Sequence, residues 1–178
     1  LEDGLAALEY GKHGTVVSSG VGAMTAVMTL LKAGDKVLMP TDVYGGTFRL
    51  FKQFFEKWGI TYTQIDLNDL NAVEDGLKAG VQMLYIESPT NPLLTVYDLS
   101  ALSALAKKYK AITAVDNTFA SPYFQNPLKH GIDIVLHSTT KYIGGHSDYV
   151  GGVVISNDPK IREQMDFARK SMGLHIDP

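Results

Sequence analysis

Short apolar segments alternate along this chain with segments whose apolar residues recur at helical spacing, and this alternation restricts the fold more than any other feature. The apolar, β-branched segments predict strands at residues 37–39, 60–65, 81–86, 112–115, 132–136 and 150–155. Helices, with their capping residues included, are predicted at 19–32, 46–57, 68–80, 98–110 and 158–172. Apolar strands alternating with helices predict an α/β fold, in which a mostly parallel sheet carries helices on both faces.

Composition and charge exclude several classes of protein. The formal net charge is -3 and the lysines and arginines are scattered, which argues against a nucleic-acid partner. The chain has 0 cysteines, so it has no disulfide, no thiolate metal site and no cysteine nucleophile, and a cytoplasmic location fits this composition. No apolar run reaches the ~18 residues that a membrane helix needs. His137 and His146 lack the spacing of ligands on one element, so no metal site is expected.

Polar side chains follow four of the predicted strands at the point where each strand ends. These runs lie at residues 42–46, 87–92, 116–118 and 137–141. In open α/β sheets, ligands bind outside the carboxyl ends of the strands. No linker interrupts residues 1–178, so we expect one domain with a site at this edge of its sheet.

The segment 18–22, Ser-Ser-Gly-Val-Gly, precedes the first predicted helix and suits a phosphate. Free N–H groups at a helix N-terminus attract anions, and glycine allows a close approach. Ordinary N-capping by serine is the commoner use of such a segment and remains the alternative. The segment is not a dinucleotide fingerprint, because Thr25 stands where the third glycine would be.

Asp116 and Lys141 each allow a structural and a chemical interpretation. A carboxylate directly after an apolar strand needs a partner, which is either a neighbouring donor such as Asn117 or Thr118 or the protonated ring nitrogen of a ligand. Lys141 follows a run of hydroxyl residues. It is either an ordinary solvated lysine or a Schiff-base lysine whose amine is activated by burial.

Taken together, the polar motifs resemble those of the Cys/Met metabolism family of pyridoxal 5′-phosphate (PLP) enzymes of fold type I. The resemblance covers the whole chain in order. The motifs that carry it are Ser18-Ser19-Gly20, Tyr44-Gly45-Gly46-Thr47, Glu87-Ser88-Pro89-Thr90-Asn91-Pro92, Asp116-Asn117-Thr118-Phe119 and the segment 137–148. The last of these, His-Ser-Thr-Thr-Lys-Tyr-Ile-Gly-Gly-His-Ser-Asp, is the most specific.

The resemblance implies a role for each polar residue at the cofactor ring. Lys141 would form the internal aldimine with PLP and, once freed, take the Cα proton of the substrate. Asp116 would keep the pyridine nitrogen protonated, which makes the ring an electron sink. Tyr44 would stack on the ring and act in proton transfer, and Asn91 would hydrogen-bond the ring hydroxyl.

The resemblance also implies a phosphate site. The backbone N–H groups of Gly20 and Val21 and the hydroxyls of Ser138 and Thr140 would hold the phosphate of the cofactor. Val21 departs from the family pattern, which usually has methionine there, but a backbone contact survives that change.

The implied activity is trans-sulfuration, by γ-elimination or γ-replacement on a sulfur amino acid. His146-Ser147-Asp148 favours the cystathionine γ-synthase and γ-lyase branch, and Gly45-Gly46 carries glycine where methionine γ-lyases typically have cysteine. Cystathionine β-lyase, O-acetylhomoserine sulfhydrylase, methionine γ-lyase and aminotransferase activities remain alternatives.

Family members are about twice as long as this chain, so we expect 1–178 to be the central, cofactor-binding part of a large domain. An N-terminal segment and a C-terminal domain of the family would be absent from it. A catalytically inactive fragment is therefore a further alternative. Family members form dimers of dimers, which implies a homo-oligomer for the complete protein.

Overall fold

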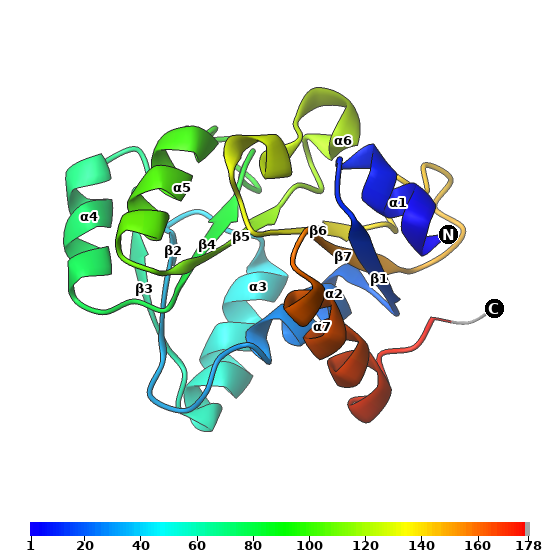
Figure 1. Cartoon of the computed structure of the whole chain (residues 1–178), viewed down its shortest axis with the longest axis horizontal. Coiled ribbons are helices and arrows are strands. Elements are labelled where there is room, and N and C mark those ends of the chain that lie inside the picture. The colour runs from blue at the N-terminus through cyan, green and yellow to red at the C-terminus, as the bar shows by residue number, and fades with distance from the viewer. Residues whose placement is uncertain (177–178) are drawn as a thin grey trace.

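A single seven-stranded sheet runs through the computed structural model, which describes residues 1–176 (Figure 1). The strand order is β1-β7-β6-β5-β4-β2-β3. The strands are β1 His13–Val17, β2 Lys36–Pro40, β3 Thr61–Ile65, β4 Met83–Glu87, β5 Ile112–Asp116, β6 Ile134–Ser138 and β7 Gly152–Ser156. The strands from β2 to β6 pair in parallel, whereas β7 is antiparallel to both of its neighbours. The predicted mostly parallel sheet is thus confirmed, with an antiparallel edge.

Helices cover both faces of the sheet, as predicted (Figure 1). They are α1 Glu2–Leu8, α2 Gly20–Met28, α3 Gly45–Leu50, α4 Leu70–Lys78, α5 Leu99–Lys108, α6 Ser121–Phe124 and α7 Pro159–Ser171. On one face, α2, α7 and the turn after α3 pack on the sheet through Met24, Met165 and Phe51. On the other, α4 and α5 pack through Val73 and Leu102, and α1 covers the β1 end. Each such buried side chain contributes roughly 1.5–3 kcal/mol.

Short polar side chains cap the N-termini of four helices, α2, α4, α5 and α7. Ser19 accepts the N–H of Gly22 at 2.9 Å, and Asp98 accepts that of Ala101 at 3.0 Å, so these two predicted caps are confirmed. Helix α4 begins one residue later than predicted. Its cap is Asp69, whose Oδ1 accepts the N–H groups of Asn71 and Ala72 at 3.1 Å each, whereas Asn68 lies in the preceding turn, where its N–H donates to Asp66.

Several predicted boundaries are wrong. Helix α1 and strand β1 were not predicted, because residues 2–17 carry only short apolar patterns. The predicted helix at 46–57 divides into α3, a π-helical turn at Phe51–Phe55 and a 3-10 turn at Glu56–Trp58. Strands β4, β5 and β6 each extend into the polar run that follows, so that Glu87, Asp116 and Ser138 are strand residues. Their backbones are therefore held by the sheet ladder.

The helices of the described residues, 1–176, include none that is long and apolar enough to cross a membrane.

Candidate active site

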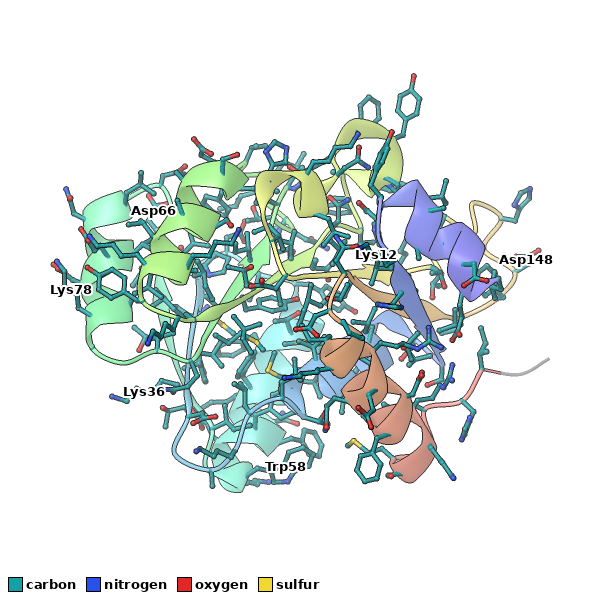
Figure 2. All side chains as sticks on the ribbon, viewed as in Figure 1. Lys12, Lys36, Trp58, Asp66, Lys78 and Asp148 are labelled. Atoms are coloured by element: carbon teal, nitrogen blue, oxygen red, sulfur yellow. The ribbon has the colours of Figure 1, made fainter. Side chains whose placement is uncertain are left out.

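A cavity of about 800 Å³ opens at the carboxyl ends of β4, β5 and β6. Of the predicted site residues, it brings together Tyr44, Asn91, Asp116, Ser138, Thr140 and Lys141. Asp148 lies at its outer edge, on the exposed loop that follows β6 (Figure 2). Gly20 and Val21 do not line the cavity. They begin helix α2 beside it.

Two carboxyl groups lie side by side in the cavity. Asp116 ends β5 directly opposite Glu87, the last residue of β4. Burial, followed by the negative charge of Asp116, raises the pKa of Glu87 to about 8. Burial also raises the pKa of Asp116, although the Thr118 N–H, 3.0 Å from Oδ1, opposes that shift. Neither carboxyl has a lysine or arginine partner within residues 1–176, so the pair favours a cationic ligand group.

Tyr44 stands at the start of α3, with its ring at the mouth of the cavity. The ring packs on Gly46, where an added Cβ would lie only 2.2 Å from Tyr44 Cε1. Glycine at this position therefore leaves the room that the ring occupies. The Tyr44 side chain is 45% exposed, so one ring face is free to cover a ligand.

The N-terminus of α2 approaches the end of β6 closely. A Cβ on Gly20 would lie 2.6 Å from the Cβ of Ser138, so a larger residue would push the helix away. The first amides of a helix have no intrahelical acceptor, which leaves the N–H groups of Gly20 and Val21 available to an anion. The Ser138 hydroxyl makes no hydrogen bond within the described residues, whereas Thr140 Oγ1 accepts the Gly151 N–H at 3.0 Å.

Lys141 lies in the turn after β6 and its side chain is exposed. The burial expected for an activated lysine is therefore not observed in this chain, because the loop that follows, residues 142–150, is itself largely exposed. Lys141 Nζ forms no salt bridge within residues 1–176. The amine is consequently accessible from the cavity that Lys141 lines.

Sequence reasoning missed several residues of the cavity wall. Thr118 Oγ1 accepts the N–H of Ser138 at 2.9 Å and so joins the ends of β5 and β6. Phe119 and Tyr142 form an aromatic wall, with ring centroids 6.2 Å apart. Thr118 and Phe119 stand in the motif that begins at Asp116, but their spacing alone assigns them no contact. No cluster of metal-ligating side chains occurs among the described residues.

Comparison with known proteins identifies the family. The family model described as Cys/Met metabolism PLP-dependent enzyme matches residues 1–178. The chain belongs to this family. This is the family that the sequence motifs predicted.

Three relatives show how this family member compares with others. A probable cystathionine γ-synthase of Herpetosiphon aurantiacus is 46% identical over 173 residues, which are 97% of this chain and 54% of that protein. A cystathionine β-lyase of Lactococcus lactis subsp. cremoris is 46% identical over 178 residues, 100% of this chain and 47% of that protein. The crystal structure of cystathionine γ-lyase from Lactobacillus plantarum, complexed with L-serine, superposes with a TM-score of 0.97 at 42% identity. It covers 99% of this chain and 46% of that one. The chain thus spans about half the length of the relatives it matches.

The residues of this family member fit PLP. A phosphate suits the free amides of α2 beside the Ser138 hydroxyl, a protonated ring nitrogen suits the buried carboxyl pair, and an aldehyde suits the accessible amine of Lys141. The close approach of Gly20 to Ser138 forms a cradle that a Cβ would fill.

Replacing Gly20 tests the phosphate cradle. Gly20→Ala places a methyl group 2.6 Å from the Cβ of Ser138, so helix α2 must move away from β6. We expect PLP to bind about ten-fold more weakly, because charge-assisted hydrogen bonds to the phosphate are lengthened. Pyridoxal, which lacks the phosphate, should bind as it does to the wild type. Absorbance titrations measure both affinities.

Gly4→Ala is the matched control, because a Cβ at Gly4 has nothing within 4 Å. If PLP and pyridoxal lost affinity equally in Gly20→Ala, the assignment of the phosphate to this cradle would be wrong.

Proposed function

We propose that this chain is the cofactor-binding part of a PLP-dependent enzyme that breaks or forms the C–S bond at Cγ of a sulfur amino acid. This is the chemistry that the names cystathionine γ-lyase and γ-synthase describe. The observation that carries the proposal is the meeting of Lys141, Asp116 and Ser138 at one cavity, beside the N-terminus of α2. Lys141 would bind the aldehyde of PLP, Asp116 the ring nitrogen and Ser138 the phosphate.

The proposed mechanism assigns one task to each side chain. Bound PLP supplies an electron sink for negative charge at Cα of the amino acid. Lys141 would hold the cofactor at its aldehyde carbon, and its freed amine would carry the Cα proton. Asp116 would hold a proton on the ring nitrogen, with Glu87 next to it at the end of the neighbouring strand. The phenol of Tyr44 would cover the ring and pass a proton at the cavity mouth.

The remaining assignments place the outer groups of the cofactor. The side-chain amide of Asn91 would bind the ring hydroxyl. The hydroxyls of Ser138 and Thr140 and the amides of Gly20 and Val21 would hold the phosphate. For Thr140 this requires its hydroxyl to leave the carbonyl oxygen of Gly151, to which it now donates at 3.2 Å.

Cleavage at Cβ is the second candidate. The Lactococcus relative that matches 100% of this chain is named cystathionine β-lyase, at the same 46% identity as the Herpetosiphon γ-synthase. The loop motif His146-Ser147-Asp148, of which Ser147 and Asp148 line the cavity, supports the γ-branch.

We also propose a cytoplasmic homo-oligomer, a dimer of dimers when complete, that acts on a small sulfur amino acid. The 0 cysteines support the cytoplasmic setting, and the net charge of -3 argues against a nucleic-acid partner. Lys12, Lys36 and Lys78 lie at separate places on the surface, so they form no basic patch for a nucleic acid (Figure 2).

Product analysis tests the proposed activity. The PLP-loaded chain is incubated with L-cystathionine, and separately with an O-acylated homoserine and cysteine, and the products are measured by mass spectrometry. γ-Cleavage gives cysteine, 2-oxobutanoate and ammonia, and γ-replacement gives cystathionine and the free acid. Homocysteine with pyruvate would instead establish β-cleavage. Bound PLP without any product would show that the chain binds the cofactor but has no activity of its own.

A further inference from the structure

The carboxyl group of Glu87 connects Tyr44 and Asn91, two residues from different loops that are both assigned to the cofactor ring. Glu87 Oε2 accepts the N–H of Tyr44 at 2.9 Å, and Glu87 Oε1 accepts that of Asn91 at 2.8 Å. Tyr44 stands 43 positions before Glu87 in the chain, whereas Asn91 follows it by 4. The start of α3 and the loop after β4 are therefore joined at a single side chain.

The position of Glu87 is costly for a carboxyl group. Its side chain is 4% exposed and lies in register with a second carboxyl group, that of Asp116. Burying an acid beside another acid destabilises the charged form, and an apolar residue would avoid that cost. The hydrogen bonds that the Glu87 carboxyl group accepts all come from backbone N–H groups at the wall of the cavity. This arrangement indicates that Glu87 acts on the cavity and is not needed for packing.

Both oxygens of the Glu87 carboxyl group take part in these contacts. The N–H of Tyr44 lies 3.1 Å from Oε1 and 2.9 Å from Oε2, and Oε1 also receives Asn91. A glutamine would present an NH₂ donor at one of the two positions and so oppose one N–H group. Aspartate keeps both oxygens but is shorter by one methylene.

We propose that Glu87 is a positioning residue for the cofactor ring. It holds Tyr44 and Asn91 in place before the ring binds, so that these two residues lose little conformational entropy on binding. This inference rests on the proposed function, because it assumes that the ring of PLP lies between Tyr44 and Asn91. Glu87 acts through the backbone of its neighbours and is not assigned a chemical step.

Two measurements on Glu87→Gln test this proposal. The first is amide hydrogen exchange by NMR in the cofactor-free chain, where the N–H groups of Tyr44 and Asn91 should exchange faster than in the wild type. The second is the affinity for PLP, which should fall about ten-fold, because the NH₂ group of glutamine would face one of the two N–H groups and displace it. Glu87→Asp provides a second variant if Glu87→Gln does not fold, and it should show both effects.

Asp133→Asn is the matched control. Asp133 Oδ2 accepts the N–H of Thr113 at 2.9 Å, so this variant also removes a carboxylate from a backbone amide, but at the opposite ends of β5 and β6. We expect faster exchange at Thr113, with the PLP affinity and the amides of Tyr44 and Asn91 unchanged. This comparison separates positioning at the cavity from a general loss of stability.

The outcomes that overturn the proposal are distinct from failure of the proposed function. If exchange at Tyr44 and Asn91 were unchanged in Glu87→Gln, Glu87 would not position them, whether or not PLP binds. If exchange accelerated but PLP bound as tightly as before, the link to the cofactor would be wrong. A wild-type chain that bound no PLP would contradict the proposed function itself.

Discussion

Borohydride reduction of the chain in the presence of PLP is expected to leave a pyridoxyl group on Lys141. Lys141 is the only lysine among the described residues that line the cavity, and Asp116 and Ser138 lie on the same wall. A cofactor held by its phosphate and ring nitrogen presents its aldehyde to this amine with a high effective concentration. Digestion and mass spectrometry identify the labelled lysine, and the visible absorption band reports formation of the linkage before reduction.

Lys141→Ala should abolish both the band and the specific label. Because the Lys141 side chain is exposed, its loss should change the free energy of unfolding by no more than about 0.5 kcal/mol. Lys12→Ala, which removes an exposed lysine that does not line the cavity, should keep the full label. Label scattered over surface lysines in the wild type would instead mean that the cavity does not orient the cofactor.

The site could be predicted because its residues follow buried strands directly. Asp116 and Ser138 end β5 and β6, and parallel strands bring their carboxyl ends to one edge of the sheet. The order of apolar strands and polar runs along the sequence therefore predicts which polar side chains meet at the edge of the sheet. Ser19 caps α2, which is the structural role that the serine and glycine pattern also allows.

The antiparallel edge could not be predicted in the same way. Strand β1 is a five-residue segment that includes His13 and Gly14, and its apolar run is too short to separate from a loop. Its pairing with β7, from His13 opposite Ser156 to Val17 opposite Gly152, joins segments from opposite ends of the chain. Such pairings depend on which edge strand still has unpaired backbone groups, and a single sequence does not show which strand that is.

A buried polar network next to the site could not be predicted either, because its residues lie far apart in the sequence. Glu9, 0% exposed, follows helix α1 and lies under the ends of β5 and β6. Its Oε1 lies 2.6 Å from His137 Nε2 and accepts from Asn117 Nδ2 at 2.6 Å. Asn117 Oδ1 in turn accepts from Gln125 Nε2 at 2.8 Å. Glu9 stands 128 positions from His137 and 108 from Asn117, so no local pattern reveals the contact.

This network fixes the residues that flank the site. Asn117 follows Asp116 in the chain, and His137 precedes Ser138. Both network residues are buried, with exposures of 0% and 1%, so their donors have no access to bulk water. Glu9 is therefore a buried partner shared by both side chains, although the Asn117 amide also donates to the carbonyl oxygen of Gln125 at 2.8 Å.

Glu9→Ala should consequently be among the most destabilising substitutions in this chain. It leaves the donors of His137 and Asn117 buried without Glu9 as their acceptor. Removing one partner of a buried ionic or charge-assisted pair costs about 3–5 kcal/mol, so we expect the free energy of unfolding to fall by that amount. Glu9→Gln should cost less, because its amide oxygen can take the place of Oε1, which makes both contacts, and only the charge is lost. Urea denaturation followed by circular dichroism measures both variants.

Glu56→Ala is the control for loss of a glutamate as such. Glu56 pairs with Lys52 at 3.3 Å, but their side chains are 37% and 59% exposed, and pairs of this kind contribute only about 0–1 kcal/mol. If Glu9→Ala cost no more than Glu56→Ala, the buried network would not stabilise the fold, and another feature would have to hold Asn117 and His137. A large cost confined to Glu9 would show that helix α1, absent from the sequence-based prediction, supports the strand ends that carry Asp116 and Ser138.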